Sequence, residues 1–205
     1  MKYLKMLGLA AVAAMALMAV TAGSASATTL EIGGVTQNAS VTITASLKAG
    51  TSAILKDTAG ISSNTCTASH VHGSTTSADR AGVTVDNAYT GDSLTGPLTP
   101  GAGGLSFSGC AREPVTADAT GELHITWTSG TNGTVTSSGA EVTTGSPFGT
   151  LNCKTNAGTH LGTLTGVAAG NATMDINAVL SCSGISSKWE ATYSVTTPSG
   201  LGVEN

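Results

Sequence analysis

Two histidines, His70 and His72, flank a single residue in a segment whose composition predicts a β-strand. Alternate residues of a strand face the same side, so both imidazoles can approach one metal ion. The candidates for a third ligand are Asp79, His124 and His160. The competing interpretation is a pair of solvated histidines beside an inward Val71, and two histidines alone are a weak metal signal. We therefore expect no resident metal or other cofactor, with His70 and His72 as the candidates to test.

The remaining reactive residues form no recognised catalytic motif. The segment 86–92, DNAYTGD, offers oxygen ligands for calcium but lacks the ligand spacing of an EF-hand loop, which favours an ordinary turn. Glu113 and Glu122 are the nearest pair of acids for a glycosidase, which needs two carboxylates facing each other across a cleft. The chain contains no GxSxG, SxxK or HExxH motif and no phosphate-binding glycine loop. We expect a protein that is not an enzyme, and a secreted hydrolase is the third alternative for its function.

Four cysteines, Cys66, Cys110, Cys153 and Cys182, predict two disulfides, because an even number in an exported chain is typical of a disulfide framework. Three pairings are open from sequence alone. We favour 66–110 and 153–182, because cysteines that are neighbours in sequence close the shortest loops. If Cys66 faces inward, strict alternation would also turn His70 inward, so a β-bulge or a strand start is expected between them.

The N-terminus predicts export from the cell. Lys2 and Lys5 precede an uncharged apolar run over residues 6–20, and Ala25-Ser26-Ala27 forms a small-x-small cleavage site. This pattern is typical of a secretory signal peptide, and the apolar run is too short for a good membrane span. We expect residues 1–27 to be the signal peptide and 28–205 to form one domain. The protein would be secreted or loosely attached to the cell envelope, with no transmembrane segment after cleavage.

Charge and composition narrow the range of partners. Removal of Lys2 and Lys5 with the signal leaves six basic residues against twelve acidic ones, a net charge of −6. Without a basic patch the chain lacks the electrostatic basis for binding nucleic acid. Charged residues are only 10% of the chain, so Thr, Ser, Asn and Gly must cover most of its surface. Regularly spaced apolar residues argue against disorder.

The elements that must position these residues are β-strands, because apolar residues alternate and show no helical period. Leu123, Ile125 and Trp127 share one face, and the segments 174–182 and 189–195 alternate in the same way. We count ten to twelve short strands separated by clusters of Gly, Pro, Asn and Ser. This spacing predicts an all-β, antiparallel β-sandwich, Ig-like or jelly-roll-like, with two disulfides.

Several strand and turn segments resemble small secreted proteins of high-GC Gram-positive bacteria. These segments are LSFSGC (105–110), TNGTVTSSGAEV (131–142), GTLTG (162–166), ATMDINAVLSC (172–182) and WEATYSVTTP (189–198). The resemblance implies secretion and an all-β domain. It carries over no catalytic residue, because that group has no established activity.

These observations favour a non-catalytic structural or interaction protein of the bacterial cell envelope or extracellular matrix. Its partner would be an unidentified envelope or extracellular molecule, and self-association is a further option. The alternative is an extracellular ligand-binding module for a glycan or another cell-surface molecule, which would stack sugars on exposed aromatic rings. Aromatic residues are only 3% of the chain, and Trp127, Trp189 and Tyr193 share the inward face, so we expect them in the core. Tyr89 is the best exposed candidate.

Overall fold

The computed structural model describes residues 28–37, 41–75, 87–91, 104–119, 121–147 and 149–204. Within these ranges the chain forms sixteen β-strands and no helix. Every strand pair is antiparallel. The all-β antiparallel class is therefore confirmed. The strands are more numerous than the ten to twelve expected.

The strands of the large sheet join end to end into eight longer paths. In chain order the paths are β3 (Thr42–Leu47) with β4 (Ala53–Asp57), β5 (Ser62–Thr75), β6 (Asn87–Gly91) with β7 (Gly104–Cys110), β8 (Val115–Ala119) with β9 (Glu122–Ser129), β10 (Asn132–Ser138) with β11 (Glu141–Ser146), β12 (Gly149–Lys154) with β13 (Thr159–Thr165), β14 (Thr173–Cys182) and β15 (Ile185–Thr197). Both members of a two-strand path pair with the same neighbouring path. For example, β12 and β13 lie one after the other along a single edge of β14.

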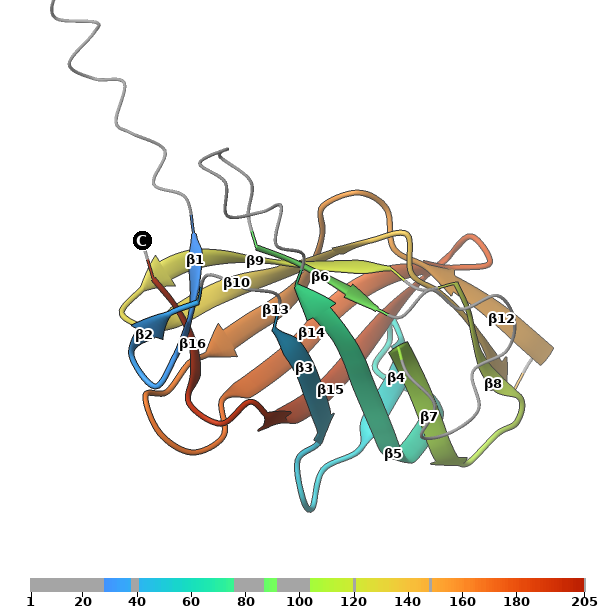
Figure 1. Cartoon of the computed structure of the whole chain (residues 1–205). Coiled ribbons are helices and arrows are strands. Elements are labelled where there is room, and N and C mark those ends of the chain that lie inside the picture. The colour runs from blue at the N-terminus through green and yellow to red at the C-terminus, as the bar shows by residue number, and fades with distance from the viewer. Residues whose placement is uncertain are drawn as a thin grey trace, which may run out of the picture.

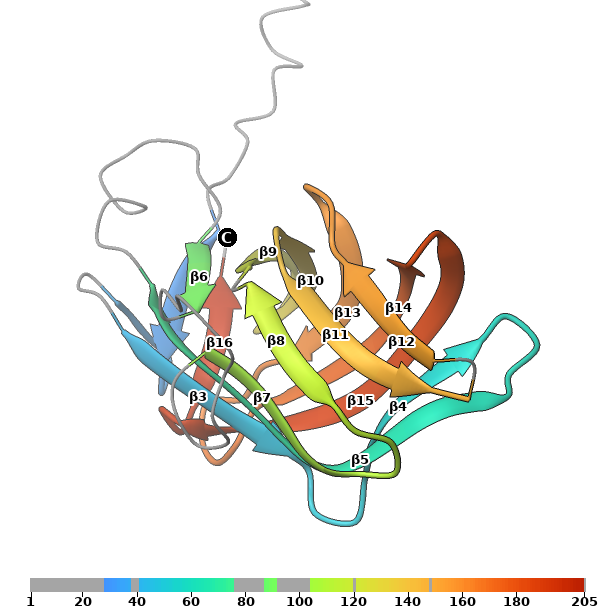
Figure 2. The same cartoon turned by 90° about the vertical axis from the view of Figure 1, so that its right-hand side faces the viewer.

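Successive paths pair with each other, and the last path returns to the first, so the large sheet closes on itself. The closing ladders join β15 to β3 and β4, and β6 bridges β5 and β9. In the half of the closed sheet that contains β7 and β8, no ladder joins these two strands within the described residues. Figure 2 faces this half, where β7 and β8 run next to each other. Opposite walls of the closed sheet face each other across the core, which gives the predicted sandwich-like arrangement (Figure 1).

A second, three-stranded sheet covers one end of the closed sheet. It contains β16 (Leu201–Glu204), β1 (Thr29–Ile32) and β2 (Val35–Thr36), in that order. The amide of Val203 donates to the carbonyl of Thr131 at 3.1 Å, which fixes this sheet to the turn between β9 and β10. Figure 1 shows the three strands together at one side of the molecule. Leu30, Leu201 and Val203 are buried within the main core cluster, so both sheets share one core.

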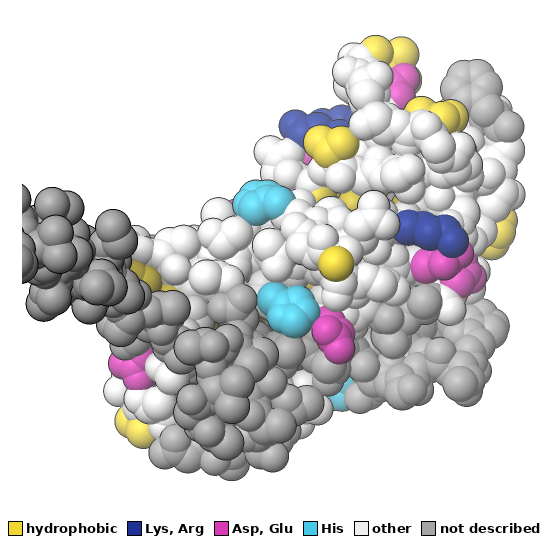
Figure 3. All heavy atoms as spheres, turned by 90° about the horizontal axis from the view of Figure 1, so that it is seen from above, with side chains coloured by type: hydrophobic (Ala, Val, Ile, Leu, Met, Phe, Trp, Pro, Cys, Tyr) yellow, Lys and Arg dark blue, Asp and Glu magenta, His cyan; other side chains and the backbone are white. Residues whose placement is uncertain are grey.

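The burial pattern confirms the predicted inward faces. Along β14, every second side chain is buried while its neighbours are exposed or half-buried. Tyr193 is entirely buried, whereas Trp127 and Trp189 are half-buried and pack against the core. On the face seen in Figure 3, charged side chains are few and scattered among white atoms, which belong to other side chains and to the backbone. Many Thr and Ser residues occupy outward positions, as expected for β-branched and small polar residues on a solvated sheet, although some, such as Ser69 and Thr144, are buried.

Both predicted disulfides are present with the favoured pairing, Cys66–Cys110 and Cys153–Cys182. Each disulfide joins residues directly opposite each other on neighbouring antiparallel strands, with a Cα–Cα distance of 3.9 Å. The first links β5 to β7 and the second links β12 to β14. Both lie in the half of the sheet where β7 and β8 are not paired.

Candidate functional site

An apolar cavity of about 70 Å³ lies between the walls of the closed sheet, in the half that carries the disulfides. Its lining comes from strands far apart in the sequence, including β4, β5, β7, β11, β14 and β15. Most of the lining atoms belong to aliphatic side chains, to Phe107 and Trp189, and to cysteines of both disulfides. The alternation of each strand turns these side chains inward, and the curvature of the sheet brings them together.

A second apolar cavity of about 60 Å³ adjoins the first. The two share Leu105, Ala140, Thr155 and Trp189 as lining residues. Ala140 lies between β10 and β11, and Thr155 directly follows β12, so the cavities meet where these paths kink. Gly121 lies at the matching kink between β8 and β9, and a Cβ atom there would lie 2.6 Å from the backbone nitrogen of Ala140. The absence of a side chain at Gly121 thus permits the close approach of two kinked paths.

Three aromatic side chains form a row along the two cavities. Phe107 and Trp189 lie edge to face, with ring centroids 6.3 Å apart, and Trp189 and Tyr193 do the same at 6.4 Å. This geometry is favoured because the positive edge of one ring meets the negative face of another. Phe107 lines the first cavity, Tyr193 lines the second, and Trp189 lines both. A molecule bound in either cavity would therefore contact at least one aromatic ring of this row.

Tyr193 is the titratable group buried deepest in this row. Its hydroxyl oxygen lies 2.9 Å from Oγ of Ser69 on β5, which is separated from β15 in the sheet by the path of β3 and β4. Burial raises the pKa of Tyr193 well above its usual range, because a phenolate would lose its hydration, and the hydrogen bond with Ser69 offsets only part of this. Tyr193 is therefore neutral at physiological pH. It lines the second cavity, and its hydroxyl is hydrogen-bonded to Ser69.

Asn64 closes the end of the first cavity by linking strands that are not neighbours in the sheet. Its Nδ2 donates to the carbonyl of Arg112 at 2.8 Å and to Oγ1 of Thr144 at 2.9 Å. Its Oδ1 accepts from the amide of Arg112 at 3.1 Å. Asn64 belongs to β5, Thr144 to β11, and Arg112 to the turn between β7 and β8. The side-chain amide of Asn64 thus joins the two walls, and the hydrogen bonds described above are made to groups of the protein.

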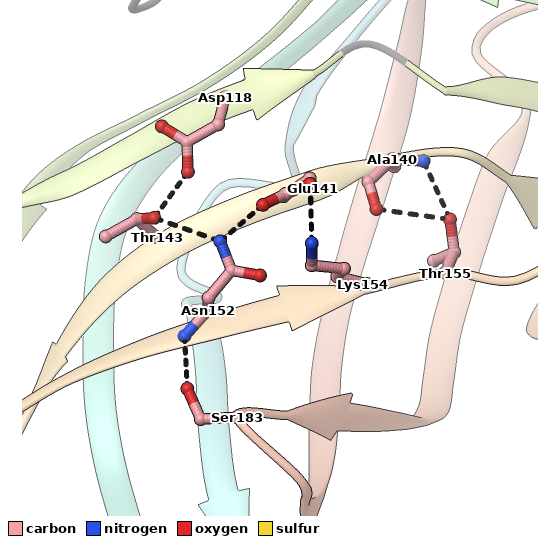
Figure 4. Close-up of polar contacts among 8 residues, drawn as sticks. All are labelled: Asp118, Ala140, Glu141, Thr143, Asn152, Lys154, Thr155 and Ser183. Atoms are coloured by element: carbon pink, nitrogen blue, oxygen red, sulfur yellow. Dashed lines mark hydrogen bonds and ion pairs between the residues drawn. The ribbon is translucent and has the colours of Figure 1, made fainter.

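Among the described residues that line the first cavity, Lys154 is the one that carries a charge, and its ammonium group is paired with Glu141. Lys154 Nζ lies 3.0 Å from Oε2 of Glu141, on the outer face of β11 and β12 (Figure 4). The hydrogen bond from Lys154, and then the one from Asn152, holds the pKa of Glu141 below its ordinary value. Asn152 also contacts Thr143, at 3.3 Å. This polar ladder lies outside the sheet and brings no charge to the cavity.

The unpaired seam between β7 and β8 runs along the first cavity. Leu105 and Phe107 line the cavity from β7, and Val115 lines it from β8; all three are half-buried. Paired strands separate only by breaking a ladder of hydrogen bonds, whereas β7 and β8 have no ladder to break. Within the described part of the wall, the seam is therefore a gap in the hydrogen-bond ladders beside the first cavity.

The structure places His70 and His72 on the outer face of β5. His70 Nδ1 lies 2.8 Å from Oγ of Ser46, and His72 Nδ1 lies 3.0 Å from Oγ1 of Thr44, both on the neighbouring strand β3. No group of three His, Cys, Asp or Glu residues able to hold a metal occurs in the part of the chain that the structure describes. His124 instead pairs with a glutamate on its own strand. The structure therefore does not bring the third-ligand candidates to the histidine pair; Asp79 lies outside the described residues.

Neither a strand start nor a shift of register lies between Cys66 and His70, because β5 is continuous and its ladder with β7 keeps one register there, but the burial pattern changes phase. Cys66 and Ser69 are both buried although three positions separate them, and Thr67 between them is exposed. The alternation therefore changes phase at this point, opposite Gly109, whose φ of 60° leaves the usual strand conformation. This change of phase allows Cys66 to face the cavity while His70 faces outward.

The remaining candidate residues lie away from the cavity. Glu113 Oε2 accepts from the amide of Val115 at 3.0 Å, and Glu122 contacts His124 at 3.2 Å. Neither glutamate lines either cavity. The calcium candidates Asp86 and Asp92 lie outside the described residues, and the side chain of Tyr89 does as well.

Comparison of the chain with known protein families, with curated proteins and with solved structures found no match. None of the described segments is a helix long and apolar enough to cross a membrane. The case for a function therefore depends on the geometry of the cavities. Sequence reasoning predicted the inward side chains but not the space between them. The only signal for that space was the small residues, such as Ala53 and Ala140, at inward positions.

Proposed function

We propose that this protein is an extracellular, non-catalytic binding protein that holds a small apolar ligand inside its closed β-sheet. The observation that carries the proposal is the pair of adjoining apolar cavities of about 70 and 60 Å³ between the walls of the sheet. A closed sheet of about eight strands has an interior that is either filled by side chains or wide enough for one small ligand. The cavities favour the second case.

The lining of the cavities supports binding over catalysis. Ligand sites are typically concave and mostly apolar, with a few polar groups. The polar groups at this site already have partners within the protein: Asn64 bonds to Thr144, and Tyr193 to Ser69. The described lining residues include no carboxylate, and the ring of the lining residue His72 lies 3.0 Å from the hydroxyl of Thr44 on the outer face. Of the two functions that the sequence left open, the cavities therefore favour ligand binding over a purely structural role in the envelope or matrix.

An extracellular location is part of the proposal. It is supported by the signal-like N-terminus and by two disulfides, which persist in oxidising compartments. The half-buried seam between β7 and β8 would then face the surroundings from which the ligand is taken.

The test is thermal unfolding of the purified, disulfide-bonded protein with and without small apolar probes. A ligand that binds only the folded state stabilises it, by about 2.7 kcal/mol at a hundredfold excess over its dissociation constant. We expect a rise in the melting temperature for at least one probe in a panel of neutral rings and of charged single-chain amphiphiles. No stabilisation by any member of such a panel would contradict the proposed function.

The matched pair of variants is Val142→Phe and Val179→Phe. Val142 lines the first cavity, whereas Val179 lies on the outer face of β14 with 64% of its surface exposed. Filling the cavity with a phenyl ring should abolish the stabilisation by probes, and the same substitution on the surface should leave it unchanged. Equal responses of both variants would place the probes somewhere other than the cavity.

A further inference from the structure

The charges near the cavities argue against a charged ligand. A buried carboxylate or ammonium group needs a partner of opposite charge or several hydrogen bonds. Lys154, the one charged residue in the described lining of the first cavity, is paired with Glu141 on the outer face. In the second cavity, the described lining residues with titratable rings are Tyr193 and His72. The Nδ1 atom of His72 lies 3.0 Å from Oγ1 of Thr44, outside the wall. The described lining thus offers no counter-charge to a head group.

The volumes argue against a long chain. A dry cavity of about 150 Å³ accepts a benzene ring. The two cavities here, of about 70 and 60 Å³, adjoin at four shared residues and together approach this size. A compact ligand of one ring, or one ring with a short substituent, matches this space. The extended chain of a fatty acid exceeds it.

The aromatic row favours a ring as the occupant. Trp189 contributes to the walls of both cavities and already meets Phe107 and Tyr193 edge to face. Aromatic pairs gain stability beyond that of the buried area when an edge meets a face or when rings stack with an offset. A ring bound at the junction of the two cavities would extend this row by one member.

From these three observations we infer that the ligand is a small, uncharged ring compound, bound against Trp189 and admitted through the seam between β7 and β8. This inference rests on the proposed function and narrows its ligand class. For a ligand of so few atoms, a dissociation constant of about 10 µM to 1 mM is expected.

The probe for this inference is iodobenzene, a neutral ring whose heavy atom quenches tryptophan emission on contact. The chain has two tryptophans, so the variant Trp127→Phe leaves Trp189 as the single emitter. Trp127 lies outside both cavities, and its indole N–H donates to the carbonyl of Gly130 at 2.8 Å. Titration of this variant, with free N-acetyltryptophanamide as the reference for collisional quenching, should show saturable quenching. Toluene should compete, and decanoate should not.

Cavity-filling variants, made in the Trp127→Phe background, show where the probe binds. Val142→Phe should weaken the binding of iodobenzene at least tenfold, and Val179→Phe should leave it unchanged. If Val142→Phe does not fold, as judged by circular dichroism, Ala53→Leu is the second cavity-filling variant, because Ala53 is buried and lines the same space.

Each outcome has a distinct meaning. Saturable quenching that toluene but not decanoate reverses, and that Val142→Phe weakens, supports the inference. If decanoate displaces iodobenzene or binds more tightly than toluene, the ligand class is wrong and the proposed cavity function stands. If iodobenzene quenches the cavity-filling variants as strongly as the parent, the ring contacts Trp189 from outside the first cavity and the inference is overturned. If neither rings nor decanoate bind the folded protein, both the inference and the proposed function fail.

Discussion

Tyr193 shows at the scale of one residue how burial sets a chemical property. Its ordinary pKa is 10.0, and burial raises the pKa in the folded protein. Above pH 10 an unfolded chain releases this proton while the folded chain keeps it. The stability that depends on this group is therefore fully present below pH of about 10 and decreases as the pH rises above it.

The corresponding variant is Tyr193→Phe. At neutral pH it should lower the free energy of unfolding by about 1–3 kcal/mol, because the hydroxyl of Ser69 loses its partner in a buried site. Between about pH 10 and 11.5, however, the variant should lose less stability than the parent, by up to about 1.4 kcal/mol for each pH unit. Denaturant unfolding at several pH values measures both effects. Parallel stability curves for parent and variant above pH of about 10 would contradict the assignment.

His70 and His72 present the opposite case, since their side chains lie on the outer face and hydrogen-bond to hydroxyls of β3. Replacement of both by Gln keeps a polar side chain that can reach the same hydroxyls. The melting temperature should change little, because exposed substitutions usually alter stability by about 0.5 kcal/mol or less. A chelator should have no effect on either protein. A chelator-sensitive melting temperature in the parent, lost in the double variant, would instead indicate a metal bound by these histidines.

At the scale of the elements, the wall formed by β8, β11 and β12 has few connections to the rest of the sheet. β12 pairs with β14 at two positions, Cys153 with Cys182 and Lys154 with Ser181. Ser183, in the turn after β14, adds hydrogen bonds with Asn152 (Figure 4). On the other side, β8 has no ladder to β7 within the described residues. The Cys153–Cys182 disulfide is therefore a principal connection of this wall.

Removal of each disulfide by paired Cys→Ala substitution should lower the stability of the whole protein by a similar amount but should loosen different parts of the sheet. The residues joined are 44 apart in Cys66–Cys110 and 29 apart in Cys153–Cys182, so the chain-entropy model gives a loss of about 4 kcal/mol for each. The structural response should differ. Without Cys153–Cys182, hydrogen exchange should accelerate first in β8, β11 and β12, and probe binding should be lost while β14 and β15 remain protected. Uniform acceleration over all strands would show that the wall does not open as a unit.

At the scale of the whole molecule, the signal-like N-terminus and the first described strand adjoin. Thr28 is buried, and its Oγ1 accepts a hydrogen bond from the amide of Trp127 at 2.8 Å. Thr28, the residue that would follow cleavage after Ala27, is thus packed against the core. We expect the protein recovered from the culture medium to begin at or near Thr28, as measured by intact mass. A secreted form that retains Met1 would contradict the predicted signal peptide.

The sequence by itself determined those features that depend on neighbouring residues. Alternation along segments such as 174–182 and 189–195 identified strands and their inward faces, because side chains of a strand alternate by geometry. Between Cys66 and His70 the sequence predicted a β-bulge or a strand start, whereas the structure has a change in the burial pattern within a continuous strand. Cysteine number in a chain with an export signal predicted two disulfides. Loop length favoured the observed pairing, although the register of the ladders is what brings the cysteines together.

Only the tertiary structure decided that the sheet closes, that pairs of short strands form single paths, and that the walls leave space between them. Closure and register depend on pairing between segments distant in sequence, about which local alternation carries no information. The contact of Asn64 with Thr144, and that of Tyr193 with Ser69, arise from this closure. The cavities depend on how completely opposing side chains fill the interior. How completely they do so depends on the curvature of the whole sheet, which cannot be deduced from the sequence of a single strand.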